Sequence, residues 1–418
     1  MKMNKIAISL IAAGVMASPL AHATNGYFSH GYGMKAKGMA GAGIALPQDS
    51  LAAATNPAGM VMVGNRIDLG LDWFKPTRGA DIAGNNCGPG CSLDGSYDGN
   101  GKSNFFIPEF GYNKMINPDM SLGVSVYGNG GMNTQYDASP FTAFGGSSPA
   151  GVNLEQLFIA PTWAMKVNPG NSVGVSLNLV RQAFEATGLE PFALMSSDST
   201  KLTNNGTDTS TGVGVKLGWT GEISPKVTLG ATYQPKTKMS KFSKYAGLFA
   251  EQGGFDIPAT YGVGVAVKAS EATTIAVDYQ AIQYSGVPSI GNSNAAGGPL
   301  GANNGAGFGW EDVKVLKLGV SQVLSNTLTL RGGYSHNNQP IPASQTMFNI
   351  LAPGVVSDHL TLGATWNVSD KNEVTVGYMH AFEKKVSGAG SIAAGQGSGE
   401  ANIKMYEDSL GIAYSWKM

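Results

Sequence analysis

The chain has 418 residues, a formal net charge of -1 at pH 7 and 13 % charged residues, which is about half the charged share of a typical soluble domain. The near-zero net charge argues against a nucleic-acid partner, and a mean hydropathy of -0.04 is too polar for a bundle of membrane helices. Such a composition fits a wall that is apolar on one face and polar on the other.

Residues 1–23 have the pattern of a secretory signal. Lys2 and Lys5 precede an apolar run over residues 6–16, and Ala21-His22-Ala23 offers a cleavage site of the small-x-small kind. The mature chain is therefore expected to begin at Thr24. No later run approaches the ~20 consecutive apolar residues of a spanning helix, so any membrane span is expected to be a strand.

Residues 24–65 show no alternation of apolar and polar positions. The segment is rich in glycine and carries three consecutive alanines at residues 52–54. Small residues allow compact folding in a confined space, so we expect a hatch inside a barrel. Asn56, Pro57 and Ala58 predict a fixed turn within it, because Asn before Pro favours a turn.

Cys87 and Cys91 are the only cysteines, and they lie in a stretch rich in Gly and Asn. In an exported chain they are free to pair, and their short spacing favours a disulfide that closes a loop. Metal binding is the alternative, which the lack of a nearby histidine disfavours.

Residues 66–418 predict strands, because apolar residues fall on every second position, as in Leu328, Leu330, Gly332 and Tyr334. Six short turns, near residues 117, 168, 224, 270, 325 and 370, alternate with long connections over residues 77–102, 130–152, 186–210, 241–255, 285–309, 337–357 and 384–401. We expect fourteen strands, beginning near Arg66, Ser103, Asp119, Asn153, Asn171, Thr211, Lys226, Asp256, Ala272, Trp310, Thr327, Asp358, Asn372 and Asn402.

The unequal lengths of the connections at the two ends of the barrel indicate that it lies in a membrane. Short turns at one end and long loops at the other are typical of bacterial outer-membrane barrels, which turn the apolar face of each strand to lipid. A soluble barrel would turn that face inward. The sequence therefore predicts an all-β fold: a transmembrane antiparallel β-barrel of about 14 strands with an amino-terminal hatch in the lumen.

Two long connections carry apolar residues where polar ones are expected. They are Phe141 and Phe144 in the first, and Leu189, Phe192, Leu194 and Met195 in the next. Exposed apolar clusters often mark a binding surface, so these residues are candidates for an outer groove. Packing of the loops on one another is the alternative.

Three segments resemble the FadL/TodX family of outer-membrane transporters for long-chain fatty acids and aromatic hydrocarbons. The first is the mature amino end, and the third, around Arg331-Gly332-Gly333-Tyr334, is the most specific. In full, the matching stretches are residues 25–28, 38–43 and 56–60; residues 257–262 with 278–280; and residues 331–335, 339–342 and 351–354. The resemblance runs through essentially the whole mature chain.

This resemblance implies a route for apolar ligands. They would be caught among the outer loops, pass to a tighter site beside the hatch, and leave sideways at a kink in the third strand. On this chain the kink corresponds to Gly128, although a strand that simply ends in a loop is the alternative. Tyr27 and Phe28 would reach the inner site if they follow the family's amino end; a tethered, ligand-free terminus is the alternative.

Arg331 is the leading candidate to bind a carboxylate head group. It shares the inward parity of Thr327 and Thr329, it matches the family's Arg-x-Gly-Tyr element, and a guanidinium can bind a carboxylate through two hydrogen bonds. The alternative is a lumen ion pair with an acid such as Glu373. Family members carry further basic residues near the tight site; the nearest here are Lys314 and Arg181, which has lipid-side parity.

No catalytic or cofactor site is expected. The mature histidines, His30, His336, His359 and His380, are not spaced as metal ligands or as partners of a nucleophile. Expected partners are a hydrophobic small molecule and the lipid and lipopolysaccharide of the bacterial outer membrane, with passive movement through a monomer. The alternatives are a general diffusion porin, which low charge disfavours, and a surface adhesin or structural barrel.

Overall fold

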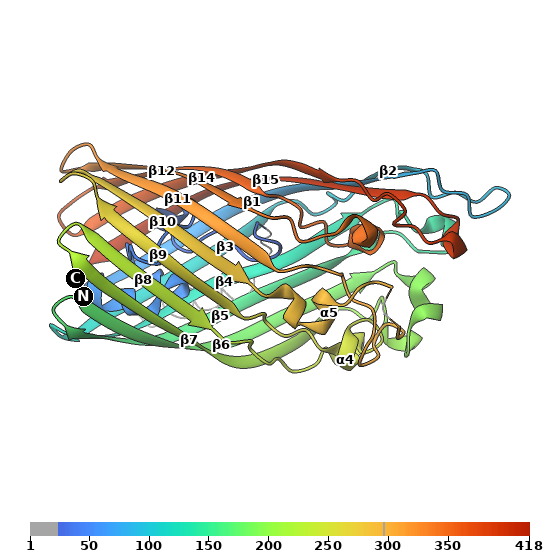
Figure 1. Cartoon of the computed structure of the whole chain (residues 1–418), viewed down its shortest axis with the longest axis horizontal. Helices are drawn as coiled ribbons and strands as arrows, with labels where there is room; N and C mark the ends of the chain where they lie inside the picture. Colours follow the sequence, from blue (N-terminus) through green and yellow to red (C-terminus); the bar gives the residue numbers. More distant parts are fainter. Residues whose placement is uncertain (1–23, 296) are drawn as a thin grey trace, which may run out of the picture.

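The computed structural model describes residues 24–295 and 297–418, and the expected signal over residues 1–23 lies outside them. It contains one antiparallel sheet that closes on itself through pairing of β1 with β15 (Figure 1). The strands are β1 (Arg66–Ala83), β2 (Gly95–Asp98), β3 (Phe105–Asn117), β4 (Met120–Tyr136), β5 (Ala150–Asn168), β6 (Asn171–Thr187), β7 (Asp208–Ser224), β8 (Val227–Gln234), β9 (Thr260–Lys268), β10 (Thr273–Ile282), β11 (Val313–Val323), β12 (Leu328–Asn337), β13 (Asp358–Asn367), β14 (Asn372–Val386) and β15 (Glu400–Lys417).

Fourteen of these strands form the barrel, so the expected number and antiparallel order are confirmed. The remaining strand, β2, was not predicted. It pairs with residues 79–82 of β1, beyond the part of β1 that pairs with β3. β1 also runs further than expected, because residues 77–83, predicted as a loop, continue the ladder with β15.

All long connections leave the same end of the barrel, at the right of Figure 1. They carry the short helices α4 (Ala250–Gly253), α5 (Pro288–Gly291) and α6 (Thr346–Asn349), and the 3-10 turns η2 (Thr142–Phe144), η3 (Glu190–Met195), η4 (Ser199–Lys201), η5 (Ser243–Tyr245), η6 (Tyr284–Gly286), η7 (Ala343–Gln345) and η8 (Ala394–Gln396). Within the described ranges, no helix has the length and apolar character needed to cross a membrane.

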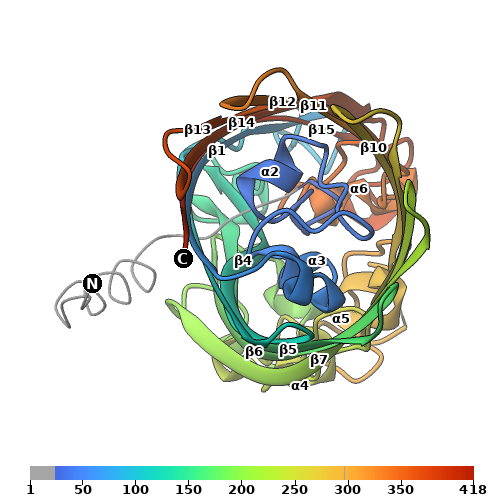
Figure 2. The same cartoon turned by 90° about the vertical axis from the view of Figure 1, so that its left-hand side faces the viewer.

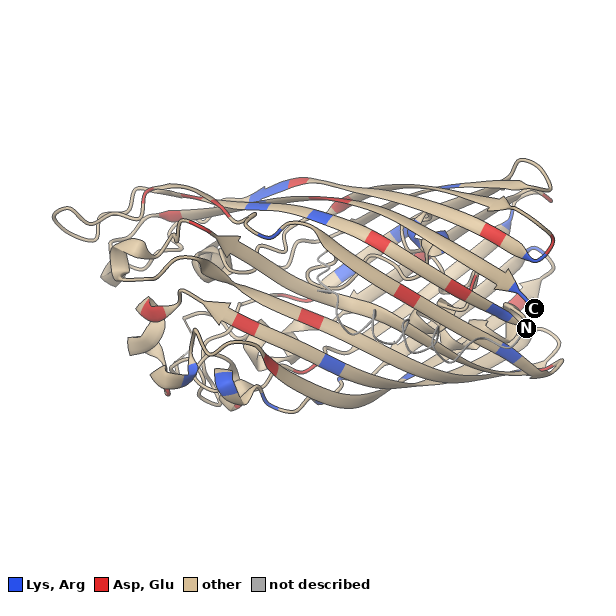
Figure 3. Ribbon diagram, turned by 180° about the vertical axis from the view of Figure 1, so that it is seen from behind, with Lys and Arg blue, Asp and Glu red and all other residues tan. Residues whose placement is uncertain are grey.

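The outer face of the wall is apolar. Along β15, Leu410, Ile412 and Trp416 are exposed, whereas the alternate residues Ser409 and Ser415 face inward and are buried. The same alternation runs around the barrel, and Lys, Arg, Asp and Glu are scattered along the strands seen from behind (Figure 3). The apolar band is thus turned outward, as a barrel in lipid requires.

Residues 24–65 lie inside the ring of strands, as the view along the barrel shows (Figure 2). We call them the amino-terminal segment; it contains α2 (Met34–Lys37), α3 (Ala52–Thr55) and η1 (Pro57–Met62). Nearly all of its residues are buried. The barrel is therefore filled by its own amino-terminal chain.

The wall makes room for this segment with glycines that face inward. At Gly218 an added Cβ would lie 1.9 Å from the side-chain oxygen of Asn56, and at Gly333 it would lie 2.4 Å from the backbone of Met39. Such distances exclude any side chain at these positions without displacement of the segment. We call the inward-facing wall glycines that lie against the amino-terminal segment the glycine belt: Gly111, Gly123, Gly174, Gly218, Gly230, Gly262, Gly264, Gly319, Gly333, Gly363 and Gly411.

Candidate functional site

The amino end of the described chain lies against the third barrel strand, β4. The register between β4 and β5 shifts after Gly128, so Asn129 has no residue opposite it. Ser29 donates its N–H to the Asn129 carbonyl at 3.0 Å, and Gly131 donates its N–H to the Tyr27 carbonyl at 2.9 Å. This β-bulge directs backbone groups of β4 to the amino-terminal segment.

The ladder between β3 and β4 ends before this bulge. β3 pairs with β4 between Phe110 and Asn117 only, while its outer residues 105–109 pair with β1. Residues 127–136 of β4 are paired with β5. Within the described chain no ladder joins residues 105–109 to β4, and the next backbone pairing on this side of β4 joins Gln135 to residues 99–101.

Aromatic side chains surround the amino end. The ring of Tyr27 is fully buried, with its centroid 5.1 Å from that of Tyr284 and 6.0 Å from those of Phe255 and Trp310. The Tyr284 hydroxyl accepts hydrogen bonds from the N–H groups of Tyr27 at 3.2 Å and Phe28 at 3.3 Å, and it donates to the Asn25 carbonyl. Tyr27 and Phe28 are thus held by uncharged contacts.

Two lysines point into the lumen where the sequence analysis named none. Lys317 donates to the His30 carbonyl at 2.8 Å, and Lys216 donates to the Ala54 carbonyl. Burial is the main cause that lowers the pKa of His30 well below its usual value, so this imidazole is neutral. Both lysines alternate with outward apolar residues, so strand parity could have identified them.

The three basic residues named from the sequence, Arg181, Lys314 and Arg331, do not contact the amino end of the described chain. Arg181 and Lys314 are exposed on the outer face. Arg331 faces the lumen, where its Nε donates to Gln48 at 2.8 Å and its Nη1 donates to Thr365 at 2.7 Å. No contact of Arg331 reaches Tyr27 or Phe28 in the described residues.

Glu373 does not pair with Arg331, which was the alternative considered for that arginine. Its carboxylate contacts Arg66 at 2.7 Å and Lys417 at 3.2 Å, and it also contacts Lys35. The three cations come from β1, from β15 and from the amino-terminal segment, and they compensate the one carboxylate. Arg331 instead links the segment to the wall through neutral oxygens.

Ion pairs fix the lower part of the amino-terminal segment to the wall. Lys37 lies 2.7 Å from a carboxylate oxygen of Asp72 and 2.9 Å from one of Glu109. Although burial opposes its charge, the two carboxylates raise the pKa of Lys37 above its usual value. Burial, with a smaller contribution from neighbouring Asp68, raises the pKa of Asp49 to about 7.

Backbone groups of the segment are bound as well. Asp278 on β10 accepts hydrogen bonds from the N–H groups of Gly43 at 2.7 Å and Ile44 at 2.9 Å. Asn56 accepts a hydrogen bond from the Ala58 N–H at 3.1 Å and donates one to the Ile44 carbonyl at 2.7 Å. The Asn56-Pro57-Ala58 turn is therefore joined to the same stretch of the segment that Asp278 binds.

A cavity of about 550 Å³ lies among the outer loops. Phe192 and Met195 line it, together with Leu300, Met347 and Phe348 from two other loops. No charged side chain is among its lining residues. A pocket of this size and character is typical of a site for an apolar small molecule.

Only two of the six predicted groove residues line this cavity. Phe192 and Met195 line the cavity, whereas Phe141 and Leu189 are fully buried between loops; the rings of Phe141 and Phe192 are 5.2 Å apart. Phe144 is half-buried and Leu194 is fully exposed. The residues from the other two loops were not predicted, because only the fold brings those loops together.

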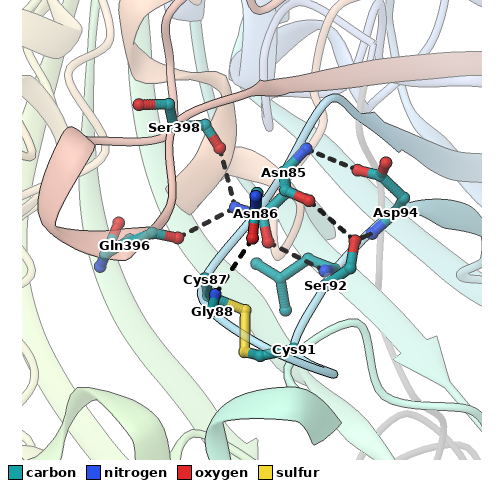
Figure 4. Close-up of a disulfide and its surroundings, with 10 residues drawn as sticks. Asn85, Asn86, Cys87, Gly88, Cys91, Ser92, Asp94, Gln396 and Ser398 are labelled. Carbon is teal, nitrogen blue, oxygen red and sulfur yellow. Dashed lines mark hydrogen bonds between the residues drawn. A yellow bond between two sulfur atoms is a disulfide. The ribbon is translucent and has the colours of Figure 1, made fainter.

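A disulfide joins Cys87 to Cys91 in the loop between β1 and β2 (Figure 4). Next to it, the Asn85 amide donates to the carbonyls of Gln396 at 2.9 Å and Ser398 at 2.8 Å. The closed loop is thereby attached to the last outer loop. Over residues 24–295 and 297–418, no group of three or more His, Cys, Asp or Glu residues is arranged to hold a metal ion.

Solved structures with this arrangement are known. Over 93 % of this chain and 99 % of the other, the fold is similar to that of the toluene transporter TodX of Pseudomonas putida, with a TM-score of 0.66 and 16 % identity. A FadL homologue of Pseudomonas aeruginosa gives a TM-score of 0.71 at 16 % identity, covering 94 % and 99 %. The toluene transporter TbuX of Ralstonia pickettii gives 0.65 at 17 %, covering 93 % and 99 %.

No curated protein sequence matches the chain. A family model does: the one described as outer membrane protein transport protein (OMPP1/FadL/TodX) matches residues 14–415. The match covers nearly the whole sequence and agrees with the closed barrel, its apolar outer face and its filled lumen. The chain therefore belongs to the FadL/TodX family of bacterial outer-membrane transporters of hydrophobic compounds.

Proposed function

We propose that the protein takes up hydrophobic small molecules, such as fatty acids or aromatic hydrocarbons, and releases them sideways into the outer membrane between β3 and β4. The observation that supports this most is the interruption of the β3–β4 ladder beside a bulge that the amino-terminal segment contacts. A filled barrel offers no straight aqueous path, whereas an interrupted wall offers a lateral one.

Capture takes place in the cavity among the outer loops. Its uncharged lining suits ligands that gain about 25 cal/mol for each Å² of apolar surface removed from water. The outer leaflet of lipopolysaccharide is charged and slows such molecules, so an apolar site above the barrel raises their local concentration. Phe192 and Met195 are the sequence-predicted residues in this role.

Transfer depends on the amino-terminal segment, to which we assign the role of a hatch over residues 24–65. Tyr27 and Phe28 close the lumen beside the bulge through neutral contacts. A ligand that displaces them would pass from the aromatic side chains around Tyr27 to the gap between the strands. No nucleotide-binding or ion-coupling pattern accompanies this route, so movement follows the concentration gradient.

Arg331 is assigned to positioning of the hatch. Because its donors engage Gln48 and Thr365, its replacement by alanine should weaken uptake of fatty acids and of neutral hydrocarbons equally. A loss confined to carboxylates would instead identify Arg331 as a ligand-binding residue.

The lateral exit can be tested with Gly128→Val. A β-branched residue in the bulge should rigidify the strand and lower uptake of labelled fatty acid and toluene by cells, while the amount of folded barrel stays constant. Gly332→Val is the matched control, because Gly332 faces outward on β12 and an added Cβ there has its nearest neighbour at 3.8 Å. Unchanged uptake by Gly128→Val would contradict exit at this point.

A further inference from the structure

Two buried lysines of the wall face the amino-terminal segment with most of their hydrogen-bond donors free. Lys216 on β7 is 7 % exposed and Lys317 on β11 is 5 % exposed. Within the described chain each ammonium group forms one hydrogen bond: Lys216 donates to the Ala54 carbonyl, and Lys317 donates to the His30 carbonyl at 2.8 Å. An ammonium group has three donors. Each lysine therefore keeps two donors that no described protein group uses.

The charges around these two lysines do not balance. Within the described chain no carboxylate lies within 4.0 Å of either ammonium group. Lys317 is attracted by Asp278 on β10, whereas the charged neighbour of Lys216 is Lys317, which repels it. The imidazole of His30 is neutral, as described above. One carboxylate thus faces two ammonium groups, and a buried charge that lacks a counterion is costly.

Both lysines line the same small cavity between the wall and the amino-terminal segment. Its volume is about 20 Å³, which is room for roughly one or two water-sized groups. Asp278 lines it from the wall, and Gly31, Ile44 and Ala54 are among the segment residues that line it. A group in this cavity would therefore contact two strands that are distant in sequence and two stretches of the segment at once.

We infer that Lys216 and Lys317 bind a small monovalent anion, chloride, in this cavity, and that the ion joins β7 and β11 to the amino-terminal segment. One negative charge cancels the excess positive charge, whereas a water molecule alone would fill the space and leave the charge unpaired. The ion also accepts hydrogen bonds from the donors that both ammonium groups leave free.

The size and the remaining polar atoms of the cavity fit this occupant. A sulfate or phosphate ion exceeds the volume and carries more charge than the site lacks, and an acyl chain does not fit beside the ion. A water next to the ion can donate to the Oδ1 atom of Asp278, which is buried without a hydrogen-bond partner in the described chain. The inference goes beyond the proposed function and does not depend on which compound is transported.

The test measures the thermal unfolding of the full-length protein in detergent, followed by the loss of the compact band on electrophoresis. Sodium chloride is exchanged for sodium gluconate at constant ionic strength, so that only the identity of the anion changes. We expect chloride to raise the unfolding midpoint by roughly 3 °C, with saturation as the site fills. If the midpoint is the same in both salts, the inference is wrong.

Lys216→Met should abolish this shift, because one ammonium group then faces one carboxylate and no excess charge remains. Lys314→Met is the matched control, since Lys314 is exposed on the outer face of the same strand as Lys317, and it should keep the full shift. A shift of equal size in Lys216→Met and in the unmodified protein would place the effect of chloride elsewhere and overturn the site.

Crystals of the unmodified protein grown in sodium bromide give a measurement that needs no variant. Bromide replaces chloride, and its anomalous signal should show one peak in contact with both ammonium groups; peaks at the protein surface alone would mean an adventitious ion only. Decanoate added in gluconate distinguishes a free ion from the head group of a ligand. Stabilisation by decanoate that disappears in Lys216→Met would assign the lysines to a ligand carboxylate and overturn the chloride site, while the proposed function stands.

Discussion

The amino-terminal segment is attached to the barrel in two different ways along its length. Its lower part, residues 33–63, is held by buried ion pairs, by Asp278 and by close backbone contact with the glycine belt. Its upper end, residues 24–32, is held by the Tyr284 hydroxyl, by the bulge of β4, by aromatic packing and by the hydrogen bond from Lys317 to the His30 carbonyl. None of these contacts is an ion pair, and hydrogen bonds and packing break at lower cost than buried ion pairs, so the upper end is the part suited to move.

The largest effect is expected from the lower attachment. Lys37→Met would leave the buried carboxylates of Asp72 and Glu109 without their shared cation, which typically costs about 3–5 kcal/mol. Unfolding in urea, followed by the loss of the compact band on electrophoresis, measures the change. Lys166→Met is the control, because Lys166 pairs with Asp119 at 3.9 Å on an exposed turn and should change stability by less than about 1 kcal/mol.

The pH dependence of the lower attachment comes next. The pKa of Asp49 is raised from its usual value to about 7, so the folded form holds a proton that the unfolded form releases at lower pH. Stability from this group is complete below about pH 4 and is lost as pH rises to 7. Asp49→Asn should therefore stabilise the protein at pH 8, by up to about 4 kcal/mol, and have little effect at pH 4. A benefit that is equal at both pH values would contradict this assignment.

Gly130→Ala should detach the upper end and leave the lower part in place. A Cβ at Gly130 would lie 1.9 Å from the Tyr27 carbonyl oxygen, and relief of such overlap typically costs about 1–3 kcal/mol. Hydrogen exchange should rise over residues 24–32 and stay slow over residues 33–63. Gly332→Ala, on the outer face, should change neither; faster exchange across the whole segment in Gly130→Ala would mean that the two parts do not act separately.

The smallest effect is expected from Tyr284→Phe, which removes only the hydroxyl that binds the amino end. The loss of hydrogen bonds to buried backbone groups should cost about 1–2 kcal/mol and accelerate exchange of the Tyr27 and Phe28 amides. Tyr233→Phe is the control, since Tyr233 is exposed on the outer face. Unaltered protection of both amides would show that ring packing alone holds the upper end.

Much of the fold follows from strand parity, and the limits of the prediction have physical reasons. The strands beginning at Arg66, Asn171, Asp358 and Asn372 start where the sequence placed them, because alternation is strict where one face meets lipid. β2 and residues 77–83 of β1 were missed, since above the apolar band the inward residues of β1 include the buried apolar residues Ala80 and Ile82, so the pattern of apolar residues facing outward no longer holds. Arg78, which is also buried, falls in that stretch, so its inward orientation was not predicted.

The candidate site was less predictable than the fold. Lys317 has inward parity, but no local pattern predicts that it lies beside the amino-terminal segment. The cavity among the outer loops combines residues from loops that are distant in sequence, and Trp310, expected to start a strand, instead lies in the loop before β11 and packs against Tyr27. Such neighbourhoods depend on barrel register and loop docking, which alternation does not encode.

Because of the glycine belt, the inner surface of the barrel is complementary in shape to this particular amino-terminal segment. Every position in it where a methyl group is introduced removes space that the filling segment needs, and leaves the lipid-facing surface untouched. The barrel could thus be converted into an open pore by substituting alanine for glycine in the wall alone, without any change to residues 24–65. Conversely, the amino-terminal segment of a relative would fit this barrel only if its larger side chains and turns lay opposite the glycines of the belt.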